Sequence, residues 1–249
     1  MHIFRGKIML SVTILTKNSA KTLKKTLESV QRFPEVLVLD SGSSDDTLEI
    51  ASLFSNVKIC STSFCGFGPL HNEAAALARY PWIFSIDSDE IVSPSLVEEL
   101  LSLPLQDPST VYAIIRNNYF HQKHIKGCSG WYPDWVIRLY NKNHTSFSQD
   151  LVHEKVVTEK SKVLFLQHPL IHEPYQDMAS FFAKMNLYSD LFSQSHSPSL
   201  SRALASSFYT FFKSYILKKG FRAGKEGFFI AIYQSHVAFY KYARKLFYP

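Results

Sequence analysis

Two aspartates separated by one residue, Asp87 and Asp89, directly follow the apolar segment 82–86. If that segment is a strand of an α/β sheet, both carboxylates lie at the carboxyl edge of the sheet, where such folds bind ligands. Carboxylate oxygens are suitable ligands for Mg²⁺ or Mn²⁺, and such ions commonly hold a diphosphate. The alternative is that both side chains only cap a helix beginning near Pro94. The first interpretation requires other strand ends to contribute to the same site.

Strand and helix patterns alternate through the N-terminal part of the chain. Apolar runs that predict strands occur at 10–15, 36–39, 57–59 and 82–86. Such alternation predicts a parallel sheet covered by helices. Polar clusters follow three of these strands, at 16–18, 40–43 and 87–89. In a parallel sheet these clusters lie along one edge and are able to form one site.

Four motifs in this part of the chain resemble those of glycosyltransferase family 2, the nucleotide-sugar enzymes of GT-A fold. They lie at 11–18, 40–47, 66–68 and 87–90. Further along, the segments 130–134 and 152–154, the pair Arg138-Leu139, His172 and a basic aromatic tail resemble the lipopolysaccharide-core β-glycosyltransferase branch. Two departures bear on donor choice. Ser19 stands where that branch usually has an acidic residue, and Leu70-His71 stands where Gln-Arg is usual.

The resemblance implies an α/β fold of GT-A type, Rossmann-like, with a mixed central sheet and a helical C-terminal extension. It divides the chain into a catalytic domain at 1–177 and a basic, aromatic extension at 178–249. Within the catalytic domain, the donor half is expected over about 8–103 and the acceptor half over about 111–177.

The resemblance also assigns donor contacts to the strand ends and the loops after them. Asp40 is expected to accept hydrogen bonds from the base or ribose, and Asp87 to contact the ribose or the metal. Asp89 is the expected direct ligand of a divalent cation, Mg²⁺ or Mn²⁺. His172 is expected as a late ligand of the metal or of a phosphate, with a structural role as the alternative. The loop 66–68 is expected to let backbone approach the nucleotide, and His71 is expected either to contact the diphosphate or to lie at the surface. The other expected donor-binding residues are Thr16, Lys17, Asn18, Ser43, Gly66, Gly68, Asn72 and Ser88.

The acceptor hydroxyl needs a general base, and inversion at the anomeric carbon requires that base on the face opposite the leaving group. Asp134, Asp150 and Glu154 are candidates. The resemblance favours Glu154, with Asp134 second. Trp131 has core packing as its alternative role, and Arg138 has an ion pair with an acid near the site. The residues expected to bind the acceptor are Trp131, Tyr132, Arg138 and His153.

The charge of the chain is concentrated at its end. Residues 200–249 carry nine Lys or Arg and one acidic residue, a net charge of +8, whereas the rest of the chain sums to −2. The same segment contains fourteen aromatic residues. No uncharged apolar run reaches the roughly 20 residues that span a bilayer. Basic helices with aromatic residues suit the surface of an anionic membrane, although packing on the catalytic domain with solvated lysines is the alternative.

These features predict an inverting, metal-dependent glycosyltransferase that moves a hexose from a nucleotide-sugar, by preference a UDP-sugar, to a lipid-linked saccharide. By resemblance the acceptor is lipopolysaccharide core. The alternatives are another glycan or protein as acceptor, or a non-catalytic nucleotide-sugar-binding protein. No nucleic-acid-binding motif accompanies the basic tail. Three cysteines without a metal pattern and the absence of a secretory signal lead us to expect a cytoplasmic protein, peripheral on the inner face of the cytoplasmic membrane.

Overall fold

The computed structural model describes residues 9–151, 153–174, 181–182, 185–186 and 197–247. Its contacts divide the chain into two compact units, each described here by itself. The first comprises Met1–Arg116 and Trp135–His172, and the second comprises Asn117–Asp134 and Glu173–Pro249. The segment 117–134 therefore groups with the C-terminal helices. The expected boundary between residues 177 and 178 stays a prediction.

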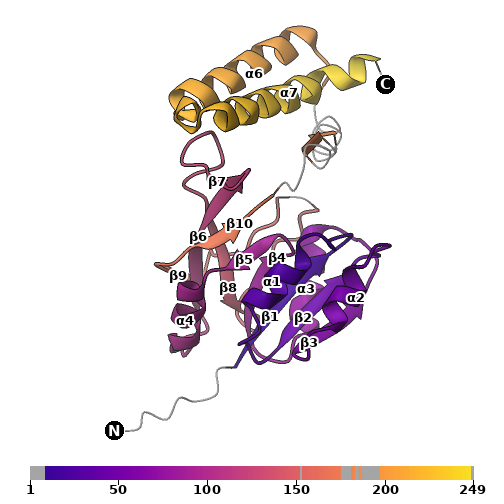
Figure 1. Ribbon diagram of the computed structural model, residues 1–249, viewed down its shortest axis with the longest axis vertical. Coiled ribbons are helices and arrows are strands. Elements are labelled where there is room, and N and C mark those ends of the chain that lie inside the picture. Colours follow the sequence, from indigo (N-terminus) through magenta and orange to yellow (C-terminus); the bar gives the residue numbers. More distant parts are fainter. Residues whose placement is uncertain (1–8, 152, 175–180, 183–184, 187–196, 248–249) are drawn as a thin grey trace. The chain divides into compact units, whose positions relative to one another are not determined.

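The first unit is built on a mixed β-sheet (Figure 1). Its strands are β1 Leu10–Thr16, β2 Val36–Asp40, β3 Val57–Ser61, β4 Trp82–Asp87, β5 Glu90–Val92, β6 Thr110–Phe120, β8 Trp135–Asn141, β9 Lys162–Phe165 and β10 Leu170–His172. Their order is β3-β2-β1-β4-β8-β6-β10-β5, and β9 also pairs with β6. The first four strands of this order are parallel, whereas β8 runs antiparallel to both β4 and β6. The expected α/β fold with a mixed sheet is confirmed.

Helices cover both faces of the parallel part of this sheet. They are α1 Leu23–Ser29, α2 Thr47–Ser52 and α3 Phe67–Leu77. In β2, Val36 and Val38 pack in the cluster that includes α1 and α2, whereas Leu37 and Leu39 pack against α3. Successive side chains of a strand point to opposite faces, so a strand buried on both sides reads as a continuous apolar run. The apolar runs of the sequence therefore identified these strands correctly.

The helix after the Asp87/Asp89 pair is α4, Pro94–Ser102. Its N-cap is Ser93, whose hydroxyl accepts a hydrogen bond from the Leu96 amide at 3.3 Å. Proline at the first helical position suits this start, because its missing N–H would have no helical partner there. The short strand β5 separates the aspartates from the cap. The alternative that the two aspartates cap this helix is therefore wrong.

The polar clusters lie on neighbouring strand ends, as expected. Thr16 at the end of β1 stands opposite Asp40 at the end of β2, and Leu15 stands opposite Asp87 at the end of β4. Because β1 lies between β2 and β4, these three ends form one continuous edge. The strand order thus brings Thr16 close to Asp40, 24 positions further along the chain, and to Asp87, 71 positions further along.

The second unit combines the segment 117–134 with C-terminal helices. Its elements are the end of β6, β7 Lys123–His124, α6 Leu200–Phe212, a π-helical turn Lys213–Leu217, a 3₁₀ turn Gly220–Ala223 and α7 Lys225–Phe247. A hydrophobic cluster joins the segment to α7 through Phe120, Ile125, Cys128, Trp131, Ala223, Ile230 and Tyr233. This unit thus has an apolar core of its own.

Helices α6 and α7 form an antiparallel hairpin (Figure 1). The Ser199 amide donates to the Tyr242 carbonyl at 3.1 Å near the open end, and the rings of Phe211 and Phe228 meet near the turn. Within the turn, a β-carbon added to Gly227 would lie 1.9 Å from the Gly220 carbonyl oxygen. Only glycine permits so close an approach of two backbones. Among the described residues no helix is long and apolar enough to cross a membrane.

Candidate functional site

Asp40 organises the loop after β2. Its carboxylate accepts hydrogen bonds from the Ser43 hydroxyl, from the Ser43 and Gly42 amides at 2.9 and 3.0 Å, and from the Thr16 hydroxyl at 3.1 Å. Burial alone would raise the pKa of this carboxyl, but the hydrogen bonds from Ser43, Gly42 and Thr16 lower it below its usual value. The side chain is only 2% exposed, so the structure uses its oxygens to shape the loop. The predicted contact of Asp40 with a base or ribose stays a prediction.

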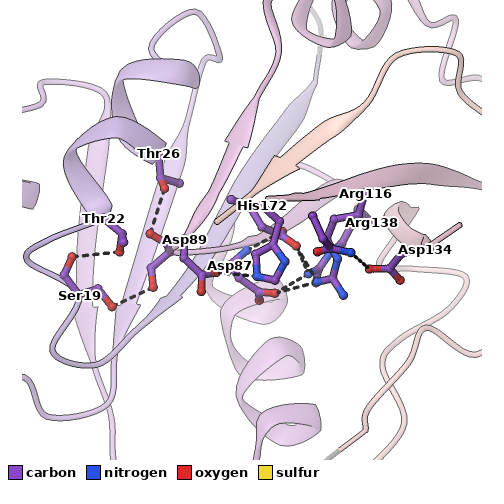
Figure 2. Close-up of polar contacts among 12 residues, drawn as sticks. Ser19, Thr22, Thr26, Asp87, Asp89, Arg116, Asp134, Arg138 and His172 are labelled. Carbon is purple, nitrogen blue, oxygen red and sulfur yellow. Dashed lines mark hydrogen bonds and ion pairs between the residues drawn. The ribbon is translucent and has the colours of Figure 1, made fainter. Parts of the chain in front are cut away.

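Asn18 and Ser19 connect the loops at this edge. The Asn18 amide donates to the Ser43 hydroxyl and its side-chain oxygen accepts from the Ser44 amide, both at 2.8 Å. Asn18 has a φ of 51°, a left-handed conformation that asparagine tolerates better than most residues. Ser19 bonds through its hydroxyl to the Ser88 hydroxyl at 2.8 Å (Figure 2). The hydroxyl at position 19 thus ties the loop after β1 to the Asp87–Asp89 turn, while Lys17 is exposed.

Asp87 belongs to a cluster of two carboxylates and two guanidinium groups (Figure 2). Arg138 on β8 lies 2.5 Å from Asp87 and 2.7 Å from Glu90, and Arg116 on β6 lies 3.0 Å from Glu90 and 3.8 Å from Asp87. The Asp87 amide also donates to Glu90 at 3.0 Å. The cluster fixes the turn in which Asp87 and Asp89 lie. The second of the two roles expected for Arg138, pairing with an acid, is the one the structure gives it.

The charges of this cluster depend on one another. Glu90 is fully buried and Arg138 is 6% exposed. Burial would raise the pKa of Asp87, but Arg138, His71 and Arg116 lower it against the opposing effect of Asp89, and the net shift is downward. Burial would likewise lower the pKa of Arg138, yet Asp87 and Glu90 raise it above its ordinary value. Asp87 is therefore held ionised by its arginines.

Sequence reasoning left two roles open for Glu90, orienting the two aspartates or lying in solvent, and it did not identify Arg116. Glu90 directly follows the Asp-x-Asp motif, but the sequence does not distinguish a buried acid from a solvated one there. Arg116 lies at the end of an apolar run, and the place of β6 in the sheet, between β8 and β10, brings it to the cluster. A local pattern does not reveal its contact with Glu90, because the two residues are 26 positions apart in sequence.

Asp89 lies beside His172, as a shared metal site requires. The Asp89 carboxylate is 3.5 Å from His172 Nε2, and both side chains are partly exposed (Figure 2). Antiparallel pairing of β10 with β5 produces this arrangement by setting His172 opposite Glu90. Among the described residues, no group of three or more His, Cys, Asp or Glu could hold a metal by itself. A carboxylate and an imidazole still fit Mg²⁺ or Mn²⁺ when a diphosphate supplies further oxygens, which is how such ions are usually bound.

The Gly66–Gly68 loop packs closely against the segment 148–151. A β-carbon at Gly68 would lie 2.1 Å from the Ser148 carbonyl oxygen, and one at Gly66 would lie 2.6 Å from the Leu151 side chain. The Gly68 amide donates to the Asp150 carbonyl at 3.1 Å. Close packing against the chain's own segment 148–151 thus accounts for both glycines, and the expected approach of this loop to a nucleotide stays a prediction.

Asn72 fastens the same segment. Its amide group donates to the Phe147 carbonyl at 3.0 Å and accepts from the Phe147 amide at 2.9 Å. Both functions of the Asn72 side chain are thus taken up by backbone, although a diphosphate contact was expected from the sequence. The segment carries Glu154 a few residues further on. The start of α3 therefore helps to position the predicted base.

His71 is buried on α3 and faces this base. Its Nδ1 is 2.9 Å from the Ser85 hydroxyl, and its Nε2 is 3.7 Å from Glu154. The ring stacks on Phe147 with centroids 4.2 Å apart. The side chain is 1% exposed, so the alternative of a surface position is wrong. Burial of an imidazole between two polar partners was not visible in the sequence.

The remaining predicted acceptor residues fall in different parts of the chain. Trp131, Tyr132 and Asp134 belong to the second unit. Trp131 is 9% exposed in the core of that unit, where its ring contacts Phe120 edge-on, so core packing is the role observed. Asp134 accepts a hydrogen bond from Asn118 at 2.9 Å. His153, in the first unit, is exposed with a φ of 63°. Acceptor binding by these residues and a base role for Asp134 stay predictions.

Comparison with known proteins gives consistent matches. The family model "Glycosyl transferase family 2" matches residues 11–158. An uncharacterised glycosyltransferase of Rickettsia bellii is 28% identical over 236 residues, covering 88% of this chain and 80% of the relative. The lipopolysaccharide core biosynthesis glycosyltransferase LpsC of Rhizobium meliloti is 26% identical over 196 residues, covering 74% and 70%. Among solved structures, S. aureus TarS 1-349 in complex with UDP-GlcNAc aligns with a TM-score of 0.50 at 16% identity, covering 90% of this chain and 79% of that one.

We predict that Arg138→Met destabilises the protein strongly. It leaves Asp87 and the buried Glu90 with one guanidinium fewer, and breaking a buried ion pair typically costs about 3–5 kcal/mol. The control is Arg32→Met, because the Arg32–Glu98 pair is 55% and 60% exposed; an exposed pair contributes at most about 1 kcal/mol. Urea unfolding at neutral pH measures the free energy of unfolding of both variants. Equal losses in the two would show that the buried pairs of Arg138 contribute no more than the exposed pair of Arg32.

The same substitution should change the pH dependence of stability. The pKa of Asp87 is lowered in the folded protein, so its contribution is present above its unfolded value of about 3.9 and is lost as the pH falls through the lower folded value. The loss of unfolding free energy caused by Arg138→Met is therefore largest near neutral pH and becomes smaller below about pH 4. A deficit that grows on acidification would oppose this assignment.

We predict that Gly68→Ala destabilises the protein although it lies in a helix. Helix propensity alone would make alanine favourable by up to about 1 kcal/mol. The collision with the Ser148 carbonyl instead forces backbone shifts that cost about 1–3 kcal/mol. The sign of the change in the free energy of unfolding, measured in urea, decides between helix propensity and the collision. A stabilised variant would show that segment 148–151 does not pack against Gly68 as described.

Proposed function

The chain belongs to glycosyl transferase family 2, and we propose that it is an inverting, metal-dependent enzyme that transfers a hexose from a UDP-sugar to a lipid-linked saccharide. The GT-A fold, the transferase class and the use of a nucleotide-sugar donor follow from the family and its relatives. The observation that carries the finer proposal is the strand-end edge with Asp89 beside His172 and Asp87 held by arginines.

The donor end of the reaction needs charge stabilisation. The diphosphate leaves with growing negative charge, and a bound divalent cation would stabilise it without a protonated acid. Asp89 and His172 would hold that cation on its protein side, while Arg138 and Arg116 keep Asp87 in one orientation. The loop shaped by Asp40 and Ser43 would hold the nucleoside. Support for a UDP-sugar comes from the fold shared with TarS, whose solved complex contains UDP-GlcNAc.

The acceptor end needs proton removal. Glu154 lies on the segment that docks against α3, with a side chain that is 21% exposed and thus open to a substrate hydroxyl. As the hydroxyl oxygen attacks the anomeric carbon, its proton passes to a Glu154 oxygen while the bond to the diphosphate breaks. Support for a lipopolysaccharide-core acceptor is the similarity to LpsC. Glu154 as base stays part of the proposal.

The helical hairpin of the second unit supports a membrane-surface role. Between α6 and α7 the basic residues Lys213, Lys218, Lys219, Arg222 and Lys225 occur without an intervening acid. Large apolar side chains are exposed in the same turn, among them Leu217 at 56% and Phe221 at 48%. Exposed apolar and aromatic groups beside clustered cations match the chemistry of an anionic bilayer surface. Such attachment would place the enzyme at the inner face of the cytoplasmic membrane, next to lipid-linked acceptors.

We predict that Asp89→Asn weakens the manganese-dependent part of nucleotide binding at least about tenfold. Calorimetric titration with UDP, GDP and CDP, each with and without Mn²⁺, should show one nucleotide bound more tightly with the metal. Loss of a residue that only supports a metal ligand typically costs about 10–100-fold in metal affinity, so loss of the charged ligand itself should weaken the binding by at least that much. The control is Asp46→Asn, an exposed carboxylate at the start of α2. Unchanged metal-dependent binding in Asp89→Asn would refute the assignment.

We predict that the double variant Leu217→Ser/Phe221→Ser weakens binding to vesicles of mixed phosphatidylcholine and phosphatidylglycerol. Each removed side chain costs on the order of 1.5–3 kcal/mol of insertion, so affinity should fall at least about tenfold. Leu53→Ser is the matched control, because Leu53 is 73% exposed in the first unit. Co-sedimentation measures both, and equal binding of the double variant and the control would exclude this surface as the membrane contact.

A further inference from the structure

His71 lies buried between Ser85 and Glu154, a position that the residues around it in the sequence do not predict. It stands where the resembled branch usually has arginine, and we expected this departure to bear on donor choice. The structure directs its ring elsewhere, to Ser85 on one side and to Glu154 on the other. Which ring nitrogen of a histidine carries the proton is set by the hydrogen bond that the other nitrogen makes, so the Ser85 contact bears on what Nε2 presents to Glu154.

The fold fixes the ring through two contacts, a hydrogen bond at Nδ1 and a stacked aromatic ring. Ser85 is fully buried on β4 and points to the face covered by α3, so it meets His71 Nδ1 at 2.9 Å. Phe147 stacks on the ring with an interplanar angle of 14°. Phe147 is itself fastened by two backbone hydrogen bonds to Asn72. The imidazole therefore has little freedom to tilt or translate.

The Nε2 atom consequently presents a fixed polar group to Glu154. The two atoms are 3.7 Å apart, a separation that commonly shortens when a substrate completes a site. The Glu154 side chain remains partly exposed and would otherwise choose among several rotamers. A base that must face one hydroxyl loses rate when its orientation is not fixed.

We propose that His71 is the positioning residue of Glu154, holding the carboxylate through Nε2 while Ser85 and Phe147 hold the imidazole. This inference rests on the proposed function, in which Glu154 is the base. His71 itself touches neither substrate nor cation in this account. Its effect is on the rate of proton removal and not on the binding of the donor.

Two substitutions separate the contacts of the ring. The amide in His71→Asn reaches about as far as Nδ1, so it keeps the Ser85 contact and loses Glu154. The amide in His71→Gln reaches about as far as Nε2, so it keeps a hydrogen-bonding group for Glu154. The assay is UDP release from UDP-glucose, UDP-galactose or UDP-N-acetylglucosamine, whichever is turned over, with Mn²⁺ and lipopolysaccharide core oligosaccharide.

We expect H71N to lower kcat at least about tenfold while the donor KM stays within about twofold, and H71Q to recover most of that loss. In an E154Q background, H71N should cause no further loss beyond about twofold, because residues that act as a unit are not additive. A full additional loss in that background, or equal kcat values for H71N and the parent, would overturn the proposal. A purely structural role would affect both backgrounds and would show no rescue by H71Q.

The outcomes distinguish this inference from the proposed function. A parent enzyme that releases no nucleotide from any of the three donors removes the proposed function and the inference with it. An active parent with independent effects at positions 71 and 154 removes the inference alone. If H71N does not fold, Ser85→Ala serves in its place, since it releases Nδ1 and should lower kcat only when Glu154 is present.

Discussion

The functional edge of this protein depends on the neutralisation of two neighbouring carboxylates, Asp87 and Glu90, by Arg138 and Arg116. Glu90 is fully buried, and a buried carboxylate without a partner would either take up a proton or unfold its surroundings. The four side chains come from β4, β5, β6 and β8. Their ion pairs therefore fix the geometry of four strands at the point where the turn that carries Asp87 and Asp89 begins.

Other parts of the site take their positions from that turn. Asp89 lies within it, and pairing of β5 with β10 brings His172 alongside. The Ser19–Ser88 hydrogen bond fixes the loop after β1 to the same turn. A second centre, built by α3 and the segment 147–154, holds Glu154. Under the proposed mechanism, the first centre would act on the departing diphosphate and the second on the incoming hydroxyl, so each half of the reaction would be supported by its own set of contacts.

The sequence predicted the α/β architecture because its strands are buried on both faces and read as apolar runs. It also predicted which strand ends meet, since parallel strands place their carboxyl ends along one edge. It could not predict Arg116 or the burial of Glu90, because antiparallel pairing across many residues decides those contacts. Nor could it show that Gly66 and Gly68 serve the chain's own backbone. A glycine reports that something approaches closely but not what approaches. The sequence could not decide between two roles for Trp131 for a similar reason, since an aromatic residue suits a core and a sugar equally well; the structure shows it packed in a core, and acceptor binding by it stays a prediction.

The close seating of segment 148–151 on the first turn of α3 has a consequence for building chimaeras in this family. The two stretches are separated by some 80 residues of chain, yet they meet backbone to backbone, with Asn72 gripping Phe147. Replacing segment 147–154 with that of a relative would change only one of the two surfaces that pack against each other. A functional swap would have to carry 66–72 together with 147–154. The two stretches that must be exchanged together are therefore far apart in sequence. A recombination point between them would combine a loop from one protein with a packing partner from another.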